Sequence, residues 1–394
     1  MGVQGKKSMK VAYLLDIFPK ITETFILNEI LAMHKKGVEI QAFAYKDEKE
    51  SVVHPRAKEV SLRYFFKASL WDKLRAHAYW IKRDAKRYFK AWGFVTVNGD
   101  GIRKLFVWDL MDTVIVDQTR PDHLHAHFGD AASNTAMLIH VLSGTPFTFT
   151  SHSYEIFQPR YDNFRIKSSL AKKHVTISRF NLEYIRDRFD VNEDWITVVH
   201  CGVDLDRLKM RAGQGRSGFI VSIARLFPEK GIDVLLGACG KLKKAGVPFE
   251  CLIAGEGPER PALEKLVRTL GLEREVRMPG NQTQEEVFRL LQEAMIKVLP
   301  SRALETMGVA LMEAMAIGVP VVAPRLNGVP ELVEDGECGF LVDPNDVDTM
   351  ADRLRQLLTD EALRTKFRET GYRKVLEEFD LDKETDKLLT IWRA

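Results

Sequence analysis

Two carboxylates, Glu305 and Glu313, lie eight positions apart in a segment that passes from an apolar run through a glycine into a helical pattern. A helix that begins after a glycine leaves its first backbone N–H groups unpaired, and the helix dipole favours an anion beside them. Glu313 falls about one and a half turns along this helix, where a carboxylate suits a diol such as a ribose, and Glu305 in the preceding loop suits sugar hydroxyls. We expect the anion site at the backbone of Gly308, Val309 and Ala310.

Two cations, Arg225 and Lys230, follow another apolar run and precede a glycine. A departing diphosphate needs charge neutralisation, which the planar fork of an arginine and the point charge of a lysine both supply. Charge-assisted hydrogen bonds contribute about 1.5 to 3 kcal/mol each, against about 0.3 to 1 kcal/mol for a helix terminus acting on an exposed charge. We therefore expect these two side chains to outweigh the helix dipole in binding a phosphate.

The segment around the two glutamates resembles the E-x7-E region of the retaining glycosyltransferases of family 4 (glycosyltransferase group 1), which have the GT-B fold. The resemblance implies that Glu305 contacts the donor sugar and that Glu313 holds the nucleotide ribose. It also matches Arg225 and Lys230 to the phosphate-binding pair of that family. Thr306 follows the first glutamate, where the family usually has glycine.

Two short turns, each after an expected strand, look like the nucleotide-contacting turns of the same family. They are the Gly-Glu-Gly sequence from Gly255 to Gly257 and the Gly-Asn pair that ends at Asn281. A lone GxG pattern is also what an ordinary tight turn requires, and both interpretations stay open. Neither turn decides between uridine, guanosine and adenosine donors.

Three histidines, His123, His125 and His127, recur with a period of two, which places them on one side of a strand. No cysteine or carboxylate cluster accompanies them in the sequence, so we do not favour a metal site. The HxH motif of the family implies instead that His127 lies near the donor sugar and acceptor and bonds a hydroxyl. His152, after a further strand, is either a second binding residue or an ordinary loop histidine.

The loop after the first expected strand lacks the glycines that many relatives carry there. Its Glu-Thr-Phe-Ile-Leu-Asn-Glu run, which begins at Glu23, resembles the exopolysaccharide-building subgroup. Thr22 and Glu23 are candidates for acceptor contact, and a helix cap with an acidic first turn explains them equally well. Asp204 and Asp206 imitate a DxD metal motif but fall at the expected domain junction, so we interpret them as linker and predict neither a metal nor a cofactor besides the donor substrate.

These residues must be positioned by strands that alternate with helices in both halves of the chain. The expected strands are 11–15, 38–44, 122–127, 147–150, 174–177 and 196–199, then 219–224, 249–254, 276–278, 296–299, 319–323 and 339–342. Such alternation predicts two doubly wound, Rossmann-like parallel α/β domains, which in GT-B proteins face each other across a cleft, with ligands at the carboxyl ends of the strands. We assign 1–203 to an acceptor-binding domain, 204–376 to a nucleotide-sugar-binding domain, and 377–394 to a C-terminal helix that crosses back to the first domain.

The composition fits a globular protein of a reducing compartment. Four scattered cysteines form no CxxC pair, net charge is only +3, and no apolar run approaches a bilayer's thickness. Segment 63–104 stands out, because it combines eleven Lys or Arg with three Asp and several aromatic residues. A solvated helix face explains this composition, and docking to an anionic membrane surface is the alternative; nucleic acid is not expected. We expect a cytoplasmic enzyme, peripheral on the inner face of the membrane if segment 63–104 docks there.

The expected function is hexose transfer, without a metal and with retention, from a UDP- or GDP-linked sugar to a hydroxyl acceptor. A glycan or a lipid-linked intermediate of polysaccharide or cell-envelope synthesis is the expected acceptor. The alternatives are a catalytically silent sugar- or lipid-binding scaffold, and an epimerase or phosphorylase with the same fold.

Overall fold

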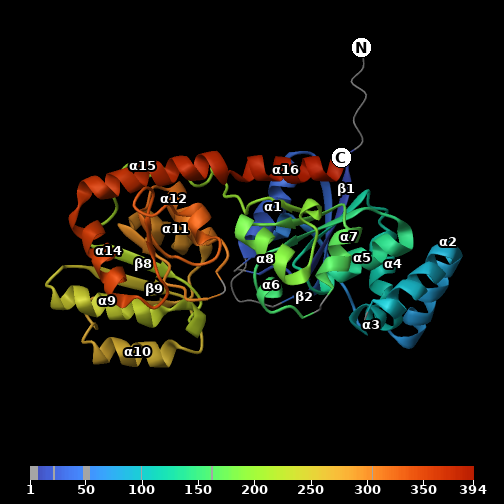
Figure 1. Cartoon of the computed structure of the whole chain (residues 1–394), viewed down its shortest axis with the longest axis horizontal. Helices are drawn as coiled ribbons and strands as arrows, with labels where there is room; N and C mark the ends of the chain where they lie inside the picture. The colour runs from blue at the N-terminus through green and yellow to red at the C-terminus, as the bar shows by residue number, and fades with distance from the viewer. Residues whose placement is uncertain (1–7, 21–22, 48–53, 99, 161–162, 304) are drawn as a thin grey trace, which may run out of the picture. The chain divides into compact units, whose positions relative to one another are not determined.

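The alternation of short apolar runs with helical stretches folds into two parallel sheets, each with helices packed on both faces (Figure 1). In the computed structural model, which describes residues 8–20, 23–47, 54–98, 100–160, 163–303 and 305–394, the chain divides into two units. The first comprises Met1–His200 with Glu384–Ala394, and the second comprises Cys201–Lys383. The expected doubly wound α/β class is therefore confirmed for both halves of the chain.

The sheet of the first unit has seven strands in the order β3-β2-β1-β4-β5-β6-β7. The strands are β1 (Lys10–Ile17), β2 (Glu39–Lys46), β3 (Ser61–Tyr64), β4 (His123–His127), β5 (Phe147–Ser151), β6 (Lys173–Thr176) and β7 (Ile196–Val198). The strand order reverses between β1 and β4, where the register pairs Tyr13 with His125. Loops that leave these two strands diverge to opposite sides of the sheet, and ligands of doubly wound sheets bind at such a point.

Two layers of helices cover this sheet. The helical segments of the unit are α1 (Thr24–Lys35), η2 (Pro55–Glu59), α2 (Leu70–Val97), α3 (Asp100–Trp108), α4 (Leu110–Asp117), α5 (Ala131–Ser143), α6 (Tyr154–Phe157), α7 (Phe164–Leu170), α8 (Arg179–Phe189), η3 (Glu193–Trp195) and most of α16 (Leu381–Arg393). One apolar core contains Trp80 and Phe106 from α2 and α3, and the other contains residues of α1 together with Trp392 of α16. The Trp392 indole donates to the Thr148 hydroxyl at 3.0 Å, which ties α16 to the sheet.

The sheet of the second unit has six strands in the order β10-β9-β8-β11-β12-β13. The strands are β8 (Phe219–Ile223), β9 (Glu250–Ala254), β10 (Val276–Gly280), β11 (Ile296–Val298), β12 (Val321–Pro324) and β13 (Phe340–Val342). The helical segments are η4 (Pro228–Lys230), α9 (Ile232–Lys244), α10 (Arg260–Thr269), α11 (Gln284–Glu293), α12 (Val309–Ala316), α13 (Val329–Leu332), α14 (Val347–Thr359) and α15 (Glu361–Glu378). Here the order reverses between β8 and β11, so the loops that follow these two strands mark the expected binding edge.

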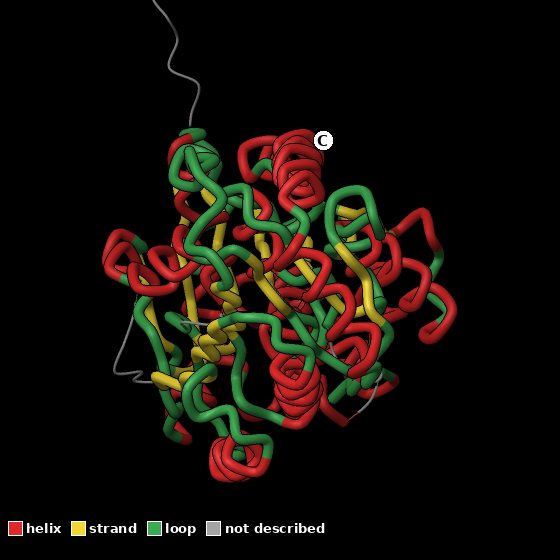
Figure 2. Tube along the Cα trace, turned by 90° about the vertical axis from the view of Figure 1, so that its left-hand side faces the viewer, coloured by secondary structure: helices red, strands yellow, loops and turns green. Residues whose placement is uncertain are grey.

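Figure 2 shows helices bordering the strands, and the burial of both strand faces requires such cover. We placed the domain boundaries after residues 203 and 376, whereas the two compact units divide after His200 and after Lys383. Among the described residues, no helix is long and apolar enough to cross a membrane.

Candidate active site

The loops that follow β8 and β11 bring Lys230 and Glu305 together in the second unit. The Lys230 ammonium lies 2.9 Å from Glu305 Oε2, and the Ser301 hydroxyl donates to the same oxygen at 3.2 Å. Asn327 fixes the loop further by donating to the Glu305 backbone carbonyl at 2.8 Å. Both charged side chains are about one sixth exposed, at 17% and 14%. The sequence therefore named two residues of one site, and the structure shows that they are partners in an ion pair.

Arg225 differs from Lys230 in having no charged partner. Its side chain is exposed, and the guanidinium carbon lies 5.0 Å from the centre of the Phe227 ring. Within the described residues it makes no ion pair or side-chain hydrogen bond. Because its N–H donors have no charged or hydrogen-bonded partner among the described residues, Arg225 is available to an anion.

Gly308 lies at the start of α12 in the left-handed region, with φ of +82°. A β-carbon there would be strained and would lie 2.9 Å from the Leu311 side chain, which explains the glycine. No side chain caps α12 within the described part of the chain. The first backbone N–H groups of α12 are thus not capped by a side chain, and an anion site at Gly308, Val309 and Ala310 stays a prediction.

Glu313 lies in the second turn of α12 and is only partly exposed. Its burial raises the pKa to about 7, and Lys297 and Arg207 oppose that shift. The carboxyl group therefore gains or loses its proton nearer to neutral pH than an exposed glutamate does. A ribose diol can bond to it, as the sequence analysis expects.

Lys297 is a residue of this site that the sequence analysis missed. It lies in β11 with no exposure, and its ammonium donates to the Val298 carbonyl at 3.2 Å. Burial lowers the pKa of Lys297 to about 7, against the attraction of Glu313 and Glu305. A lysine inside an otherwise apolar strand was the available signal, because lysine is almost never fully buried without a reason.

The two glycine turns have a packing explanation. A β-carbon on Gly255 would lie 1.9 Å from the Ala224 carbonyl oxygen, and one on Gly257 would lie 2.3 Å from the Leu226 carbonyl oxygen. Both glycines thus let the turn after β9 approach the loop that carries Arg225. Asn281 is exposed directly after β10. The tight-turn explanation is sufficient for these glycines, and a nucleotide contact stays a prediction.

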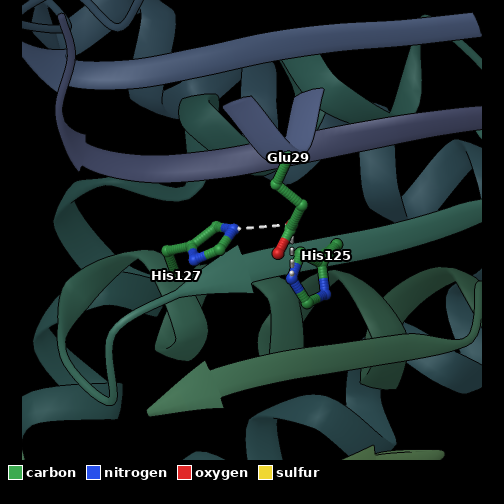
Figure 3. A group of neighbouring side chains, drawn as sticks. All are labelled: Glu29, His125 and His127. Carbon is green, nitrogen blue, oxygen red and sulfur yellow. Dashed lines mark hydrogen bonds and ion pairs between the residues drawn. The ribbon is translucent and has the colours of Figure 1, made fainter. Parts of the chain in front are cut away.

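In the first unit, His127 ends β4 and is enclosed by side chains. Its Nδ1 lies 3.0 Å from His152 Nε2. Its Nε2 lies 3.1 Å from Glu29 Oε1 (Figure 3). His152 is 4% exposed, and its burial lowers the pKa well below the ordinary value. The structure therefore brings His127 and His152 together. It also adds Glu29, the last residue of the Glu-Thr-Phe-Ile-Leu-Asn-Glu run, which had no role assigned from the sequence.

Glu29, His125 and His127 form the one group of three that could hold a metal among the described residues. No metal was expected here, because no carboxylate cluster accompanies the histidines along the chain. In space Glu29 of α1 supplies one, so this ground for excluding a metal was wrong.

The weaker acceptor candidates have different outcomes. Thr22 lies outside the described residues. Glu23 occupies the N-cap position of α1, makes no capping hydrogen bond with its side chain, and pairs with Lys20 at 2.8 Å. Thr306 is buried at 6% exposure, in the place where glycine is usual.

Two Rossmann-like units, each with polar groups at the strand reversal of its sheet, are the architecture expected of the GT-B fold. Residues 22–207 match the family model described as Glycosyltransferase Family 4, and residues 209–374 match the model described as Glycosyl transferases group 1. The chain is 31% identical to a putative colanic acid biosynthesis glycosyltransferase (WcaL) of Salmonella typhimurium, over 94% of this chain and 96% of that protein. It is 38% identical to the amylovoran biosynthesis glycosyltransferase AmsK of Erwinia amylovora, over 42% of this chain and 43% of that protein.

The chain belongs to the glycosyltransferase family that these two models describe, family 4 (group 1), in the group that includes the exopolysaccharide enzymes. Solved structures agree on the fold. A glycosyltransferase from Rickettsia africae superposes with a TM-score of 0.75 at 17% identity, covering 98% of each chain. Anabaena Alr3699/HepE, solved in complex with UDP and glucose, superposes with a TM-score of 0.74 at 18% identity, covering 98% of this chain and all of that one.

Proposed function

We propose that the chain transfers a hexose, with retention of configuration and without a metal ion, from a nucleotide-diphosphate sugar to a hydroxyl acceptor. In this proposal Arg225, Lys230 and the open start of α12 hold the diphosphate. Glu313 holds the ribose and Glu305 the sugar. The observation that carries the proposal is the position of two cations and the uncapped start of α12 on loops at the strand reversal of one sheet.

The donor is UDP- or GDP-linked, and UDP-glucose is the first compound to test, because a structural neighbour was solved with UDP and glucose. The acceptor is a glycan or a lipid-linked intermediate of polysaccharide or cell-envelope synthesis. The relatives named for colanic acid and amylovoran biosynthesis support this class of acceptor. No carboxylate is assigned as a nucleophile; the acceptor oxygen attacks the anomeric carbon, the bond to phosphate breaks, and the departing phosphate takes the proton.

The first experiment is a thermal-shift screen with UDP, GDP, ADP and their hexose derivatives. A tight diphosphate at a hundredfold excess over its dissociation constant adds about 2.7 kcal/mol of stability, which gives a clear rise in melting temperature. If no nucleotide stabilises the chain, the result favours the silent scaffold. If the chain epimerises the donor or cleaves a glycan with phosphate, the function is that of an epimerase or a phosphorylase rather than transfer.

The second experiment measures turnover of variants with the donor so identified. Lys230→Ala and Glu305→Ala should each lower turnover about a hundredfold or more, as the loss of a transition-state charge contact does. Lys265→Ala, which removes an exposed lysine of α10, is the matched control. Wild-type rates in either site variant contradict the assignments. Metal independence predicts an unchanged rate in EDTA. Retention predicts an α-linked product, judged by NMR of the anomeric proton.

We also propose that α2 docks the enzyme on the inner face of an anionic membrane. This helix carries seven Lys or Arg against two Asp. It buries Trp80 and Tyr88 in the core, yet leaves Trp71 at 72% and Phe89 at 64% exposure. Each basic residue near an anionic surface adds about 1 kcal/mol, and exposed aromatic rings insert at the interface.

Sedimentation with vesicles tests this docking. Binding to vesicles that contain phosphatidylglycerol, weakened by salt and absent with pure phosphatidylcholine, is the expected result. Trp71→Ser combined with Phe89→Ser should reduce it at least fivefold without changing turnover of a water-soluble acceptor. Equal binding to both kinds of vesicle, or no effect of the variant, contradicts the proposal.

A further inference from the structure

The histidines of β4 meet a carboxylate that comes from a helix about a hundred residues earlier in the chain. The Glu29 side chain of α1 points towards His127 and His125 of β4 (Figure 3). Tyr13 of β1 contacts the same carboxylate. Its Oε1 accepts a hydrogen bond from the Tyr13 hydroxyl at 2.8 Å and lies 3.1 Å from His127 Nε2. β1 and β4 are the two strands between which the order of the first sheet reverses, so this cluster lies at the expected binding edge.

His127 itself is not available to a sugar in this arrangement. Both of its ring nitrogens are occupied, one by His152 and one by Glu29, and its side chain is only 1% exposed. Glu29 is different, because its side chain is 18% exposed. Its second oxygen, Oε2, has no hydrogen-bond partner among the residues that the structure describes.

The donor directions in the cluster follow from the chemistry of its members. Burial raises the pKa of Tyr13 well above its ordinary value, and Glu29 adds to that shift, so the phenol keeps its proton and donates. A carboxylate only accepts, so His127 Nε2 carries the proton that faces Glu29. With the proton on Nε2, the His127 ring accepts at Nδ1 from His152 Nε2–H.

This assignment leaves His152 Nδ1 as an unprotonated acceptor. That atom is buried and has no partner within the described residues. A buried acceptor without a partner is tolerated more often than a buried N–H without one. The structure therefore favours His152 protonated on Nε2 over His152 protonated on Nδ1. The hydrogen-bond chain thus runs from His152 to His127 and ends on one oxygen of Glu29.

We propose that Glu29 is the group through which the first unit holds the acceptor hydroxyl, with Oε2 accepting the hydrogen bond from that hydroxyl. Tyr13 and His127 are positioning residues that fix the carboxylate through Oε1, so His127 acts through Glu29. The inference rests on the proposed glycosyl transfer. In that reaction Glu29 orients the hydroxyl oxygen towards the anomeric carbon, and the hydroxyl proton leaves with the phosphate.

A divalent metal is the competing occupant of the same atoms. Binding to His127 Nε2 needs its lone pair, which moves the His127 proton to Nδ1 and makes His152 Nε2 the acceptor. His152 Nδ1 would then be a buried N–H without an acceptor among the described residues. The hydrogen-bond pattern therefore favours a hydroxyl over a metal at Glu29.

A double-mutant cycle tests the assignment. The assay measures the initial rate of nucleoside diphosphate release from the sugar nucleotide that the thermal screen identifies. It compares wild type with Glu29→Gln, His127→Gln and the double variant. Water alone and added methyl hexosides serve as acceptors. Glu39→Gln, which alters an exposed carboxylate of β2, is the matched control.

The expected result is a rate at least tenfold lower in Glu29→Gln and the same loss, within twofold, in the double variant, because a positioning residue adds nothing once its target is gone. The dissociation constant of the nucleotide, measured by calorimetry, should stay within twofold of wild type, since the donor binds the second unit. If Glu29→Gln fails to fold, Tyr13→Phe removes one donor to Oε1 and should lower the rate three- to tenfold at an unchanged dissociation constant.

Other outcomes overturn the assignment. A wild-type rate in Glu29→Gln, or losses that multiply in the double variant, would show that His127 acts on the substrate directly. A stoichiometric metal in the purified wild type, measured by mass spectrometry, would make Glu29 a ligand. A wild type that releases no nucleotide from any sugar nucleotide refutes the proposed function itself and this assignment with it, whereas the other results refute the assignment alone.

Discussion

The substitution Lys297→Met should make the second unit more stable while removing a charge from its binding site. Lys297 is fully buried in β11, and its pKa falls from 10.5 to about 7, chiefly through burial. Methionine has nearly the same length and no charge, so it fills the space without the cost of a desolvated ammonium. Buried ionic groups replaced by apolar side chains of similar volume often increase stability.

The magnitude follows from linkage. In the folded chain Lys297 loses its proton more readily than in the unfolded chain, so its destabilising effect is complete below pH 7 and disappears as the pH rises towards 10.5. The shift corresponds to a penalty of about 4 kcal/mol at pH 7 and about 2 kcal/mol at pH 9. Removing the ammonium also leaves Glu313 without its neighbour and costs part of this gain. We expect the free energy of unfolding of Lys297→Met to exceed that of wild type by about 2 to 3 kcal/mol at pH 7 and by less at pH 9.

Hydrogen exchange resolved by peptide measures this change within the second unit. The slowest amides of β11 and β12 report the free energy of unfolding of that unit. All six tryptophans lie in the first unit, so the denaturation curve followed by tryptophan fluorescence serves as an internal control and should stay close to that of wild type. A variant less stable than wild type at pH 7, or a difference that does not change with pH, refutes the reasoning.

Three other predictions concern the donor site. Affinity for uridine, measured by calorimetry, should rise by up to about tenfold from pH 6 to pH 8 as Glu313 ionises, and in Glu313→Gln it should no longer depend on pH. Glu305→Gln frees Lys230 from its ion pair, so UDP should bind a few-fold more tightly while turnover falls about a hundredfold; parallel losses of both would contradict this. Gly308→Ala should lower the free energy of unfolding by about 1 kcal/mol or more, because φ of +82° strains any other residue, and denaturant titration checks it.

The sequence was sufficient to predict the fold because its signals are local. Apolar runs of strand length separated by helical periods correspond to nearly every strand of both sheets, with ends that differ by one or two residues. The exception is β3 (Ser61–Tyr64), an exposed edge strand in a segment dominated by basic and aromatic residues. An edge strand with little burial carries no apolar pattern by which it could be recognised.

The site was predictable only in part, because partners that meet across strands leave no trace in spacing. Arg225, Lys230 and Glu305 could be named from their place after strands. The ion pair of Lys230 with Glu305 joins residues 75 positions apart, and the hydrogen bond of His127 with Glu29 joins residues 98 apart. Spacing shows which faces residues share, and only the packed sheet shows which side chains they contact.

The different states of the two cations have a consequence for the order of events at the donor site. Arg225 is exposed and unpaired within the described residues, so it can meet an arriving diphosphate at once. Lys230 is already paired with Glu305 Oε2, so a phosphate oxygen that binds the ammonium competes with that carboxylate oxygen. In the proposed donor site, a phosphate that takes over Lys230 loosens the ion pair and leaves more of the Glu305 carboxylate to the sugar hydroxyls. We therefore expect the ion pair to favour sugars that carry a diphosphate over free sugars.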